Sequence, residues 1–397
     1  MHGKTAAAAP AAPAATGDPK DTDDFKYKLY SECPVWTDAH KSLMSKTVTP
    51  ELFAKMKDLK SKFGYTFSNA IQTGVETPHL GVGCTAGDED SWEVFKDLYY
   101  PVIKGWHNYD PETQTHKQDL DASKLECDEA TQAALNKFVI STRVRAARNI
   151  AGFALPAGTS AEDRAGVETV LKGAFESFDG DLKGTYYPLT GMADDIRDGL
   201  LAEGFLFQVP SAKNLLTMAG AARNWPDNRG IFHNDAKTAL CWCNEEDQCR
   251  IISMSKDGDI KAVFARFAEI SKKLEEAATA AGKSFMFNEK LGFLGTCPSN
   301  LGTGLRAGVM VTLVNFNKDP VALDAVCSKF DLQPRGSNGE HSEAIGGNFD
   351  VSNKQRIGFT EVELVQKMIS GVAKVIEYEE MLIAGKTMDE VKAAAGI

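Results

Sequence analysis

The stretch of sequence that is most informative about both fold and chemistry occupies residues 297–306 and reads Cys-Pro-Ser-Asn-Leu-Gly-Thr-Gly-Leu-Arg. Pro298 cannot continue the hydrogen-bond ladder of a sheet, so regular structure is interrupted beside a cysteine. The hydroxyl of Ser299 can hydrogen-bond a Cys297 thiolate and lower the pKa of that thiol. A buried, inert thiol is the alternative interpretation. The stretch ends in a cation, Arg306, directly after its glycine-rich part.

The usual glycine-rich phosphate loops are missing from the sequence. A P-loop needs a glycine five residues before Gly-Lys-Ser or Gly-Lys-Thr. The two tripeptides of this kind, at 282–284 and 385–387, have Ala277 and Glu380 at that position. Residues 302–304, Gly-Thr-Gly, do not complete a GxGxxG motif. Any phosphate must therefore be bound by cationic side chains.

Five arginines stand in settings that suit phosphate binding. Arg143 and Arg145 alternate in a strand-like segment, which sends both guanidinium groups to one face. Arg250 begins a strand after an acidic turn, Arg306 follows the glycine-rich stretch, and Arg335 precedes a glycine. Forked, charge-assisted hydrogen bonds from such side chains can hold a triphosphate. Each arginine taken singly also fits an ordinary surface cation.

Two acidic features accompany these cations. Residues 245–247, Glu-Glu-Asp, stand at the tip of a predicted hairpin, where a solvated turn is the alternative interpretation. Glu340 lies in the loop Gly-Ser-Asn-Gly-Glu-His of residues 336–341, which is too polar to be core. Because paired carboxylates suit a planar guanidinium, Glu246 and Glu340 are candidates to bind one.

Charge and hydropathy exclude several classes of partner. The 397 residues carry a formal net charge of -11, so we expect no bulk attraction to nucleic acid or to anionic membranes. No apolar run is long enough for a membrane span. Eight cysteines without paired zinc spacing predict reduced thiols in a cytoplasmic protein. No carboxylate cage for a metal is visible, so no protein metal site is predicted.

The chain divides into four predicted segments. Residues 1–28 form an extension rich in alanine and proline, which we expect to be disordered because it resembles neither a transit nor a signal peptide. Residues 29–115 read as a small helical domain, and residues 116–136 as a polar linker. Residues 137–397 mix strand hairpins with long amphipathic helices. The predicted class is α+β, with an antiparallel sheet flanked by helices.

Particular elements follow from local signals. Thr49 and Pro50 predict a helix start, after which apolar residues as far as Leu59 and Phe63 recur at helical spacing. Residues 240–243 and 250–254 predict a hairpin. Thr360, with a glutamate three residues later, predicts the capping box of a long helix.

Five segments resemble the creatine and arginine kinase family in order along the chain. They are residues 141–145 (Ser-Thr-Arg-Val-Arg), 230–235 (Gly-Ile-Phe-His-Asn-Asp), 244–247 (Asn-Glu-Glu-Asp), 297–306 and 350–353 (Asp-Val-Ser-Asn). The resemblance extends from about Val48 to Gly385, and residues 297–306 are closer to the creatine kinase form. It implies a small helical N-terminal domain and a larger domain with an antiparallel sheet. It also implies phosphoryl transfer between ATP and a small guanidino compound.

The resemblance implies a role for each candidate residue. Glu246 and Glu340 would bind the substrate guanidinium, and Cys297 would pack against it as a thiolate. Mg²⁺ would be bound through the oxygens of ATP or ADP. The residues implied for the nucleotide and the transferred phosphoryl group are Arg143, Arg145, His233, Arg250, Arg306, Met310, Arg335 and Asp350, of which Met310 stands where the family has a histidine.

The choice of guanidine depends on the loop that precedes residue 82. Only six residues, 76–81, separate Val75 from Val82, and arginine kinases resemble this short form whereas creatine kinases have a longer loop. The implied substrate is arginine, whose carboxylate the backbone N–H groups of the glycine-rich turn could bind. The residues implied for the substrate are Gly81, Val82, Gly83, Cys84 and Thr85, although arginine kinases usually have a tyrosine in place of Thr85.

Several alternatives remain open from the sequence. Lombricine, taurocyamine and creatine are other possible acceptors, and Trp106 stands at a position that varies with substrate in the family. A protein-arginine kinase would share the catalytic domain, but the helical domain would close its site to macromolecules. A binding protein without activity is a third hypothesis. The enzyme is expected to be a monomer or a homodimer.

Overall fold

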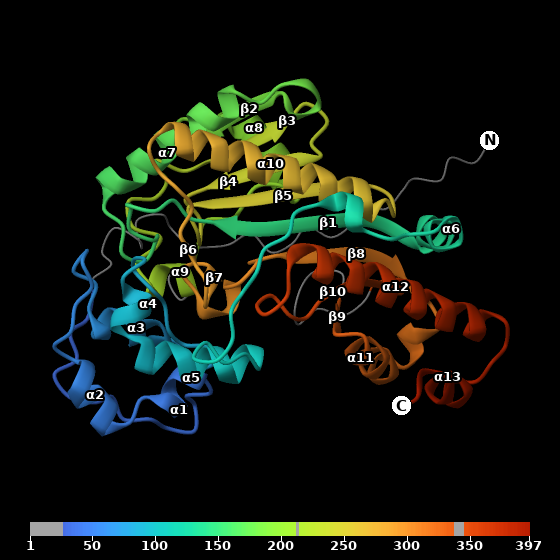
Figure 1. The fold of residues 1–397 in the computed structure, drawn as a ribbon, viewed down its shortest axis with the longest axis horizontal. Helices are drawn as coiled ribbons and strands as arrows, with labels where there is room; N and C mark the ends of the chain where they lie inside the picture. The colour runs from blue at the N-terminus through green and yellow to red at the C-terminus, as the bar shows by residue number, and fades with distance from the viewer. Residues whose placement is uncertain (1–26, 212–213, 337–344) are drawn as a thin grey trace.

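The structure is a computed structural model that describes residues 27–211, 214–336 and 345–397. A small helical domain packs beside a larger domain that is built on an antiparallel sheet (Figure 1). The predicted α+β class is confirmed. Residues 1–26 of the predicted extension lie outside the described residues. None of the helices in the described part of the chain is long and apolar enough to cross a membrane.

The helical domain begins with short, well-capped helices. The hydroxyl of Thr49 accepts the N–H of Leu52 at 3.2 Å, and Pro50 is the first helical residue, as predicted. Tyr65 and Trp92 belong to its buried core. Its helices are α1 (Leu43–Thr47), α2 (Pro50–Met56), α3 (Phe67–Glu76), α4 (Ser91–Val94) and α5 (Lys96–His107).

The predicted continuation of α2 through Leu59 and Phe63 is wrong. The helix ends at Met56, and Leu59 and Phe63 are 39% and 49% exposed. The N–H of Ser61 donates to the carbonyl of Tyr65, so residues 61–65 form a turn with its own hydrogen bonds. Apolar residues at helical spacing cannot maintain a helix when no partner surface buries them.

The connection between the domains is partly helical. It contains the 3₁₀-helix η2 (Ala122–Lys124) and the helix α6 (Glu129–Phe138), which begins inside the predicted linker of residues 116–136. The side chain of Asp128 caps α6 by accepting the N–H of Thr131 at 2.7 Å. The domain boundaries themselves stay a prediction.

Eight strands of the described residues form one antiparallel sheet, in the order β2-β3-β4-β5-β1-β8-β10-β9. The predicted hairpin is confirmed, because β4 and β5 are consecutive and pair Cys243 with Cys249. The strands are β1 (Val139–Arg148), β2 (Gly184–Pro188), β3 (Gly230–Asn234), β4 (Ala239–Cys243), β5 (Cys249–Ser255), β8 (Arg306–Thr312), β9 (Leu332–Arg335) and β10 (Asn348–Asn353), and a separate hairpin joins β6 (Phe287–Asn288) to β7 (Gly292–Phe293).

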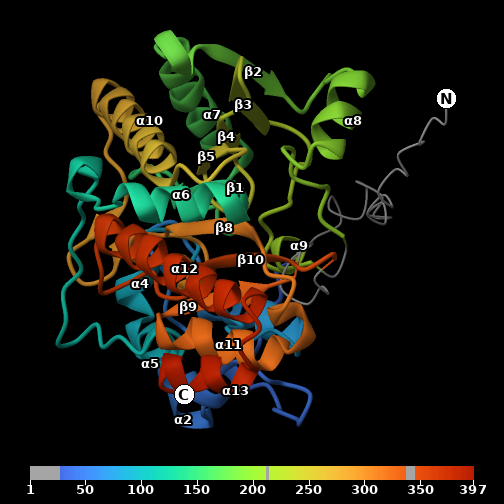
Figure 2. The ribbon, with the colours of Figure 1, turned by 90° about the vertical axis from the view of Figure 1, so that its right-hand side faces the viewer.

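Long helices cover one face of the sheet. Figure 2 shows α6, α10 and α12 on one side and α8 on the other. The predicted capping box of α12 is confirmed, with Thr360 and Glu363 exchanging side-chain and backbone hydrogen bonds. The remaining helices are α7 (Ala161–Glu176), α8 (Asp194–Ala202), α9 (Leu215–Met218), α10 (Ile260–Ala280), α11 (Pro320–Lys329), α12 (Glu361–Ile383), α13 (Met388–Ala395) and the 3₁₀-helices η3 (Gly180–Leu182), η4 (Pro298–Asn300) and η5 (Phe316–Lys318).

The core of the helical domain extends into the larger domain. Leu294, Cys297 and Leu301 are buried in the same apolar cluster as Phe67 and Tyr99. The loop that contains Cys297 and Leu301 therefore packs directly against the helical domain. This contact places residues 297–301 where the two domains meet.

Candidate active site

The register of the sheet brings the predicted cations to one face. Arg145 on β1 pairs directly with Arg306 on β8 and, on its other side, with Ile252 on β5. Arg250 is two residues from Ile252, so the pleat directs it to the same face. Arg143 is two residues from Arg145 and shares this direction.

The remaining predicted arginine lies on the same face at the far edge of the sheet. Arg335 on β9 pairs with Asp350 on β10, which in turn pairs with Met310 on β8. Met310 is four residues from Arg306, an even spacing that keeps both side chains on one face. The interpretation of these arginines as scattered surface cations is therefore wrong.

The cations on this face lack sufficient opposing charge. Burial, followed by the nearby charges of Arg250 and Arg306, lowers the pKa of Arg143 to about 10. Burial, with Arg250 as the next cause, also lowers the pKa of Arg145. Asp350 partly compensates by an ion pair with Arg306 at 2.8 Å. The Nε atoms of Arg143 and Arg306 are buried and have no hydrogen-bond partner among the described residues. A bound polyanion would relieve this repulsion.

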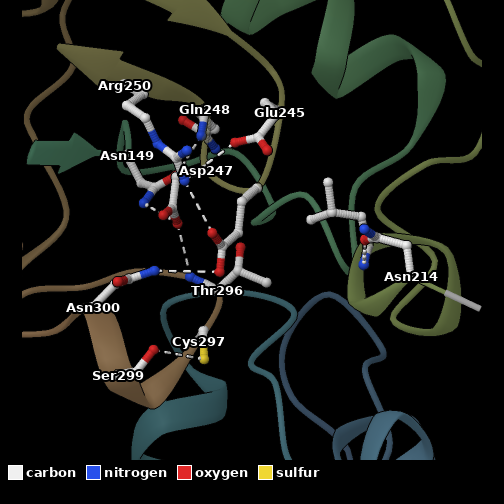
Figure 3. A network of polar contacts seen from close by, with 12 residues as sticks. Asn149, Asn214, Glu245, Asp247, Gln248, Arg250, Thr296, Cys297, Ser299 and Asn300 are labelled. Atoms are coloured by element: carbon white, nitrogen blue, oxygen red, sulfur yellow. Dashed lines mark hydrogen bonds and ion pairs between the residues drawn. The ribbon is translucent and has the colours of Figure 1, made fainter. Parts of the chain in front are cut away.

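The acidic hairpin tip is held in the site and is not a solvated turn. Glu246 Oε2 accepts from Arg250 Nη2 at 2.9 Å, and its Oε1 accepts from Asn300 Nδ2 at 3.2 Å. Burial raises the pKa of Glu246 to about 7, although Arg250 acts in the opposite direction. Figure 3 shows the tip, with Glu245 and Asp247, next to Arg250 and above the loop that carries Cys297.

Cys297 lies at the base of this arrangement, 4% exposed. Its Sγ is 3.1 Å from Ser299 Oγ, which is the predicted hydrogen bond (Figure 3). The thiolate that the resemblance implies beside a bound guanidinium stays a prediction. Burial, reinforced by the charge of Glu246, raises the pKa of Cys297 to about 12 and outweighs the effect of Ser299.

Comparison with known protein families agrees with this geometry. Residues 166–382 match the ATP:guanido phosphotransferase C-terminal catalytic domain, and residues 38–104 match the ATP:guanido phosphotransferase N-terminal domain. The chain belongs to this family. It is a phosphagen kinase, an enzyme that transfers phosphate between ATP and a guanidino group.

Relatives of this phosphagen kinase differ in the substrate that they are named for. The chain is 44% identical to a testis creatine kinase of Oncorhynchus mykiss over 89% of its length and 92% of that protein. It is 43% identical to an arginine kinase of Stichopus japonicus over 92% of its length and 97% of that protein. The crystal structure of a lombricine kinase superposes with a TM-score of 0.83 at 40% identity, covering 89% of this chain and 96% of that one.

Arg356, for which the sequence predicts no role, also lines the site of the phosphagen kinase. Arg356 Nη1 donates to the carbonyl of Ser299 at 2.7 Å and to Asn300 Oδ1, and burial lowers its pKa to about 10. Arg356 lacks the signals that identified the other arginines, which were strand alternation, a preceding acidic turn or glycine-rich stretch, and a glycine directly after the arginine. A cavity of about 60 Å³ is lined by Arg145, Ala146, Ala147, Glu246, Arg250, Asn300, Gly304, Arg306 and Arg356.

The residues expected to contact adenine lie on the same face of the sheet. Strand pairing runs from His233 on β3 through Leu240 and Ile252 to Arg145. The ring of His233 stacks on Tyr187 with a centroid distance of 5.0 Å, and its Nδ1 is 2.9 Å from the carbonyl of Asn234. Adenine binding by His233 and Met310 stays a prediction.

The predicted substrate loop, residues 81–85, is mostly buried in the helical domain. Thr85 is fully buried, and its hydroxyl is 3.0 Å from the hydroxyl of Tyr65, so this hydroxyl already has a partner inside the domain. Cys84 is 1% exposed, and burial, followed by the nearby charge of Cys297, raises the pKa of its thiol. Glu340 lies outside the described residues, and its predicted role stays untested.

Proposed function

We propose that this phosphagen kinase transfers the γ-phosphoryl group of MgATP reversibly to the guanidino group of L-arginine, giving phosphoarginine and ADP. The observation that supports arginine is the glycine-rich turn of residues 81–83, which follows the short loop 76–81. The N–H groups of Val82 and Gly83 make no hydrogen bond to the described residues, and Gly83 has a φ of +82°. Backbone amides in such a turn suit a carboxylate, which arginine carries beyond its guanidino group.

The arginines of the sheet supply the electrostatic part of the reaction. A phosphoryl group in transfer spreads negative charge over its equatorial oxygens, and catalysis depends on alignment and neutralisation of that charge. Arg145 and Arg306 face each other across β1 and β8, and Arg250 stands on the next strand. We assign Arg143 and Arg335, on the same face, to the nucleotide phosphates. Asp350 orients Arg306 through their ion pair.

The acids align the nucleophile. The guanidino nitrogen attacks the γ-phosphorus, the bond from that phosphorus to the β–γ bridging oxygen breaks, and ADP leaves with the electron pair. The proton from the nitrogen passes to Glu246, whose pKa of about 7 suits a base at neutral pH. Glu340 is proposed as the second carboxylate on the guanidinium. Cys297 packs against the same group, whose positive charge favours the thiolate.

The described residues contain no group of three or more His, Cys, Asp or Glu side chains that could hold a metal. We therefore propose that Mg²⁺ takes its oxygens from the nucleotide and from water. When bound, it neutralises charge on the phosphates. All eight cysteines are free thiols, which suits a reducing compartment such as the cytoplasm.

A panel of guanidines tests the substrate. Initial rates with MgATP are measured for arginine, creatine, glycocyamine, taurocyamine and lombricine in a coupled ADP assay. The highest kcat/KM is expected for arginine. Creatine is the second candidate, because creatine kinases are 42–44% identical to this chain. Turnover with creatine and none with arginine would overturn the proposal.

A further inference from the structure

Asn149 joins two segments of the site from a buried position. It follows the last residue of β1 and is 1% exposed. Its Nδ2 donates to Asp247 Oδ1 at 3.0 Å and to the carbonyl of Leu294 at 2.9 Å. Its Oδ1 accepts the N–H of Gln248 at 2.8 Å. One amide side chain therefore links the hairpin tip to the segment 294–297. Figure 3 shows Asn149 beside Asp247 at the tip.

The same network reaches the helical domain. Asp247 Oδ1 also accepts the N–H of Thr296 at 2.8 Å. The carbonyl of Thr296 accepts the N–H of Ala86 at 2.8 Å. Ala86 directly follows the candidate substrate loop 81–85. Three segments that carry candidate substrate contacts are thus joined through consecutive hydrogen bonds that begin at Asn149.

A second buried amide strengthens the junction. Gln248 Oε1 accepts the N–H of Ile150 at 2.7 Å, and its Nε2 donates to the carbonyl of Ala154 at 3.0 Å. The chain after β1 and the chain after the hairpin tip are therefore held together by side chains of both segments. Neither amide titrates, so the hydrogen bonds that Asn149 and Gln248 make with backbone groups do not depend on pH.

An amide side chain at position 149 can make all three hydrogen bonds, because it contains both donors and an acceptor. The carboxylate of Asp247 and the carbonyl of Leu294 require donors, whereas the N–H of Gln248 requires an acceptor. Burial raises the pKa of Asp247, and the hydrogen bonds from Thr296 and Asn149 lower it. Loss of the amide would leave buried polar groups unsatisfied, which forces the segments to move apart or admit water.

We propose that Asn149 is a positioning residue for the guanidino end of the site. It acts through Asp247 and Thr296, whose neighbours in the sequence are Glu246 and Cys297. The amide fixes the distance between the proposed base and the thiol, so that a guanidinium fits between them. This inference rests on the proposed function, because it concerns how the same site is held in register.

Asn149→Ala is the first test. Misalignment of the nucleophile is expected to lower kcat for arginine by about 10- to 100-fold. The dissociation constant of MgADP, measured by calorimetry, should stay near the wild-type value because the ladders that carry the arginines are unchanged. The second readout is the rate at which iodoacetamide alkylates Cys297, followed on its own peptide by mass spectrometry. That rate should rise, because a loosened segment 294–297 exposes the thiol.

An exchange of amide and acid provides the matched test. Asn149→Asp alone places two buried carboxylates together and should lower kcat and raise the Cys297 alkylation rate. Adding Asp247→Asn restores one donor and one acceptor between the two positions and still offers an acceptor to Thr296. Partial return of both readouts toward wild type is expected. Equal values for the single and the double variant would contradict the proposal.

The control variant is Asn315→Ala, which removes an amide that donates to the buried Glu379 at 3.0 Å on α12. It should lower the Tm without changing the Cys297 alkylation rate. If Asn149→Ala does not fold, the amide–acid exchange decides. A folded Asn149→Ala with wild-type kcat and alkylation rate would overturn the inference. If the wild-type enzyme phosphorylates no guanidine in the panel, the proposed function fails, and the alkylation rates still decide the role of Asn149.

Discussion

Arg145 on β1 and Arg306 on β8 are direct partners in the antiparallel ladder, so two cations face each other across neighbouring strands. Like charges in this position destabilise a sheet. One carboxylate, Asp350, forms an ion pair with Arg306 at 2.8 Å, and the pKa of Arg145 is lowered chiefly by burial and next by Arg250. A bound triphosphate would remove the repulsion between these cations.

Replacing Arg145, one member of this pair, should lower activity without lowering stability. Arg145→Met is expected to leave the Tm of the ligand-free enzyme unchanged or to raise it, because the repulsion and the buried charge are both removed. It should lower kcat by about 10²-fold or more, through loss of charge neutralisation on the phosphoryl group. Thermal melting without nucleotide and the coupled assay test both parts.

The matched control is Arg197→Met, because Arg197 is an exposed arginine of α8 that pairs with Asp194 at 2.7 Å. Its kcat should equal that of the wild-type enzyme. A strongly lowered Tm in Arg145→Met would show that Arg145 serves mainly to hold the sheet together.

The pH dependence of stability and of kcat/KM should reflect the titration of Glu246. Burial raises its pKa from 4.5 to about 7, so the folded state binds a proton that the unfolded state releases at lower pH. Its contribution to stability is therefore present below about pH 4.5 and is lost as the pH rises through about 7. The base is active when deprotonated, so kcat/KM for the guanidine should rise through the same range.

Glu246→Gln should remove that pH limb and lower kcat by about 10²-fold or more, because both alignment and proton transfer are impaired. A variant that keeps the wild-type profile would show that another group is responsible for the limb. Glu340→Ala should have an effect of similar size, about 10²-fold, by loss of alignment alone.

Cys297 should tune the reaction without performing it. In the ligand-free enzyme the raised thiol pKa of about 12 predicts slow alkylation by iodoacetamide at pH 7, increasing toward alkaline pH. Cys297→Ser should keep measurable activity, with kcat lower by about 10-fold, because a hydroxyl packs similarly but does not ionise. Complete loss of turnover in a folded Cys297→Ser enzyme would instead favour a covalent role.

Arg356 should contribute to catalysis in two ways, by holding residues 299–300 in place and by adding positive charge to the site. Its guanidinium donates to the carbonyl of Ser299 and to Asn300 Oδ1, and lysine cannot reproduce this fork. Arg356→Lys is therefore expected to lower kcat by about 10-fold or more, through misplacement of residues 299–300 and loss of charge at the site. Equal kcat values for Arg356→Lys and the wild type would assign it to structure alone.

The substrate loop can be tested at Gly81. A Cβ added there would lie 2.9 Å from the ring of Trp106, so the loop or the ring must shift. Gly81→Ala should raise KM for the guanidine by about 10-fold, which corresponds to roughly 1.4 kcal/mol, and should leave KM for MgATP unchanged. Gly173→Ala, where an added Cβ has nothing within 4 Å, is the control. A change in KM for MgATP alone would contradict the assignment of this loop to the guanidine.

Local signals in the sequence were reliable where chemistry is short-range. Thr49 and Thr360 cap their helices as expected, since a hydroxyl needs only the backbone of the next turn as its partner. The alternation of Arg143 and Arg145 was also correct, because the pleat of a strand fixes it. The predicted helix through Leu59 and Phe63 does not form, because it depends on a long-range contact. Helical spacing predicts a helix only if another surface covers the apolar side.

The sequence by itself determined which chemical groups are present and the order in which they occur, and this sufficed for the family and the reaction. Only the tertiary structure decided which groups meet. Arg356 and Asn149 contact residues more than fifty and about a hundred positions away, and no local pattern encodes such contacts. The thiol of Cys297 shows the same limit, because its protonation depends on burial by two domains, a property that its neighbours in the sequence do not reveal.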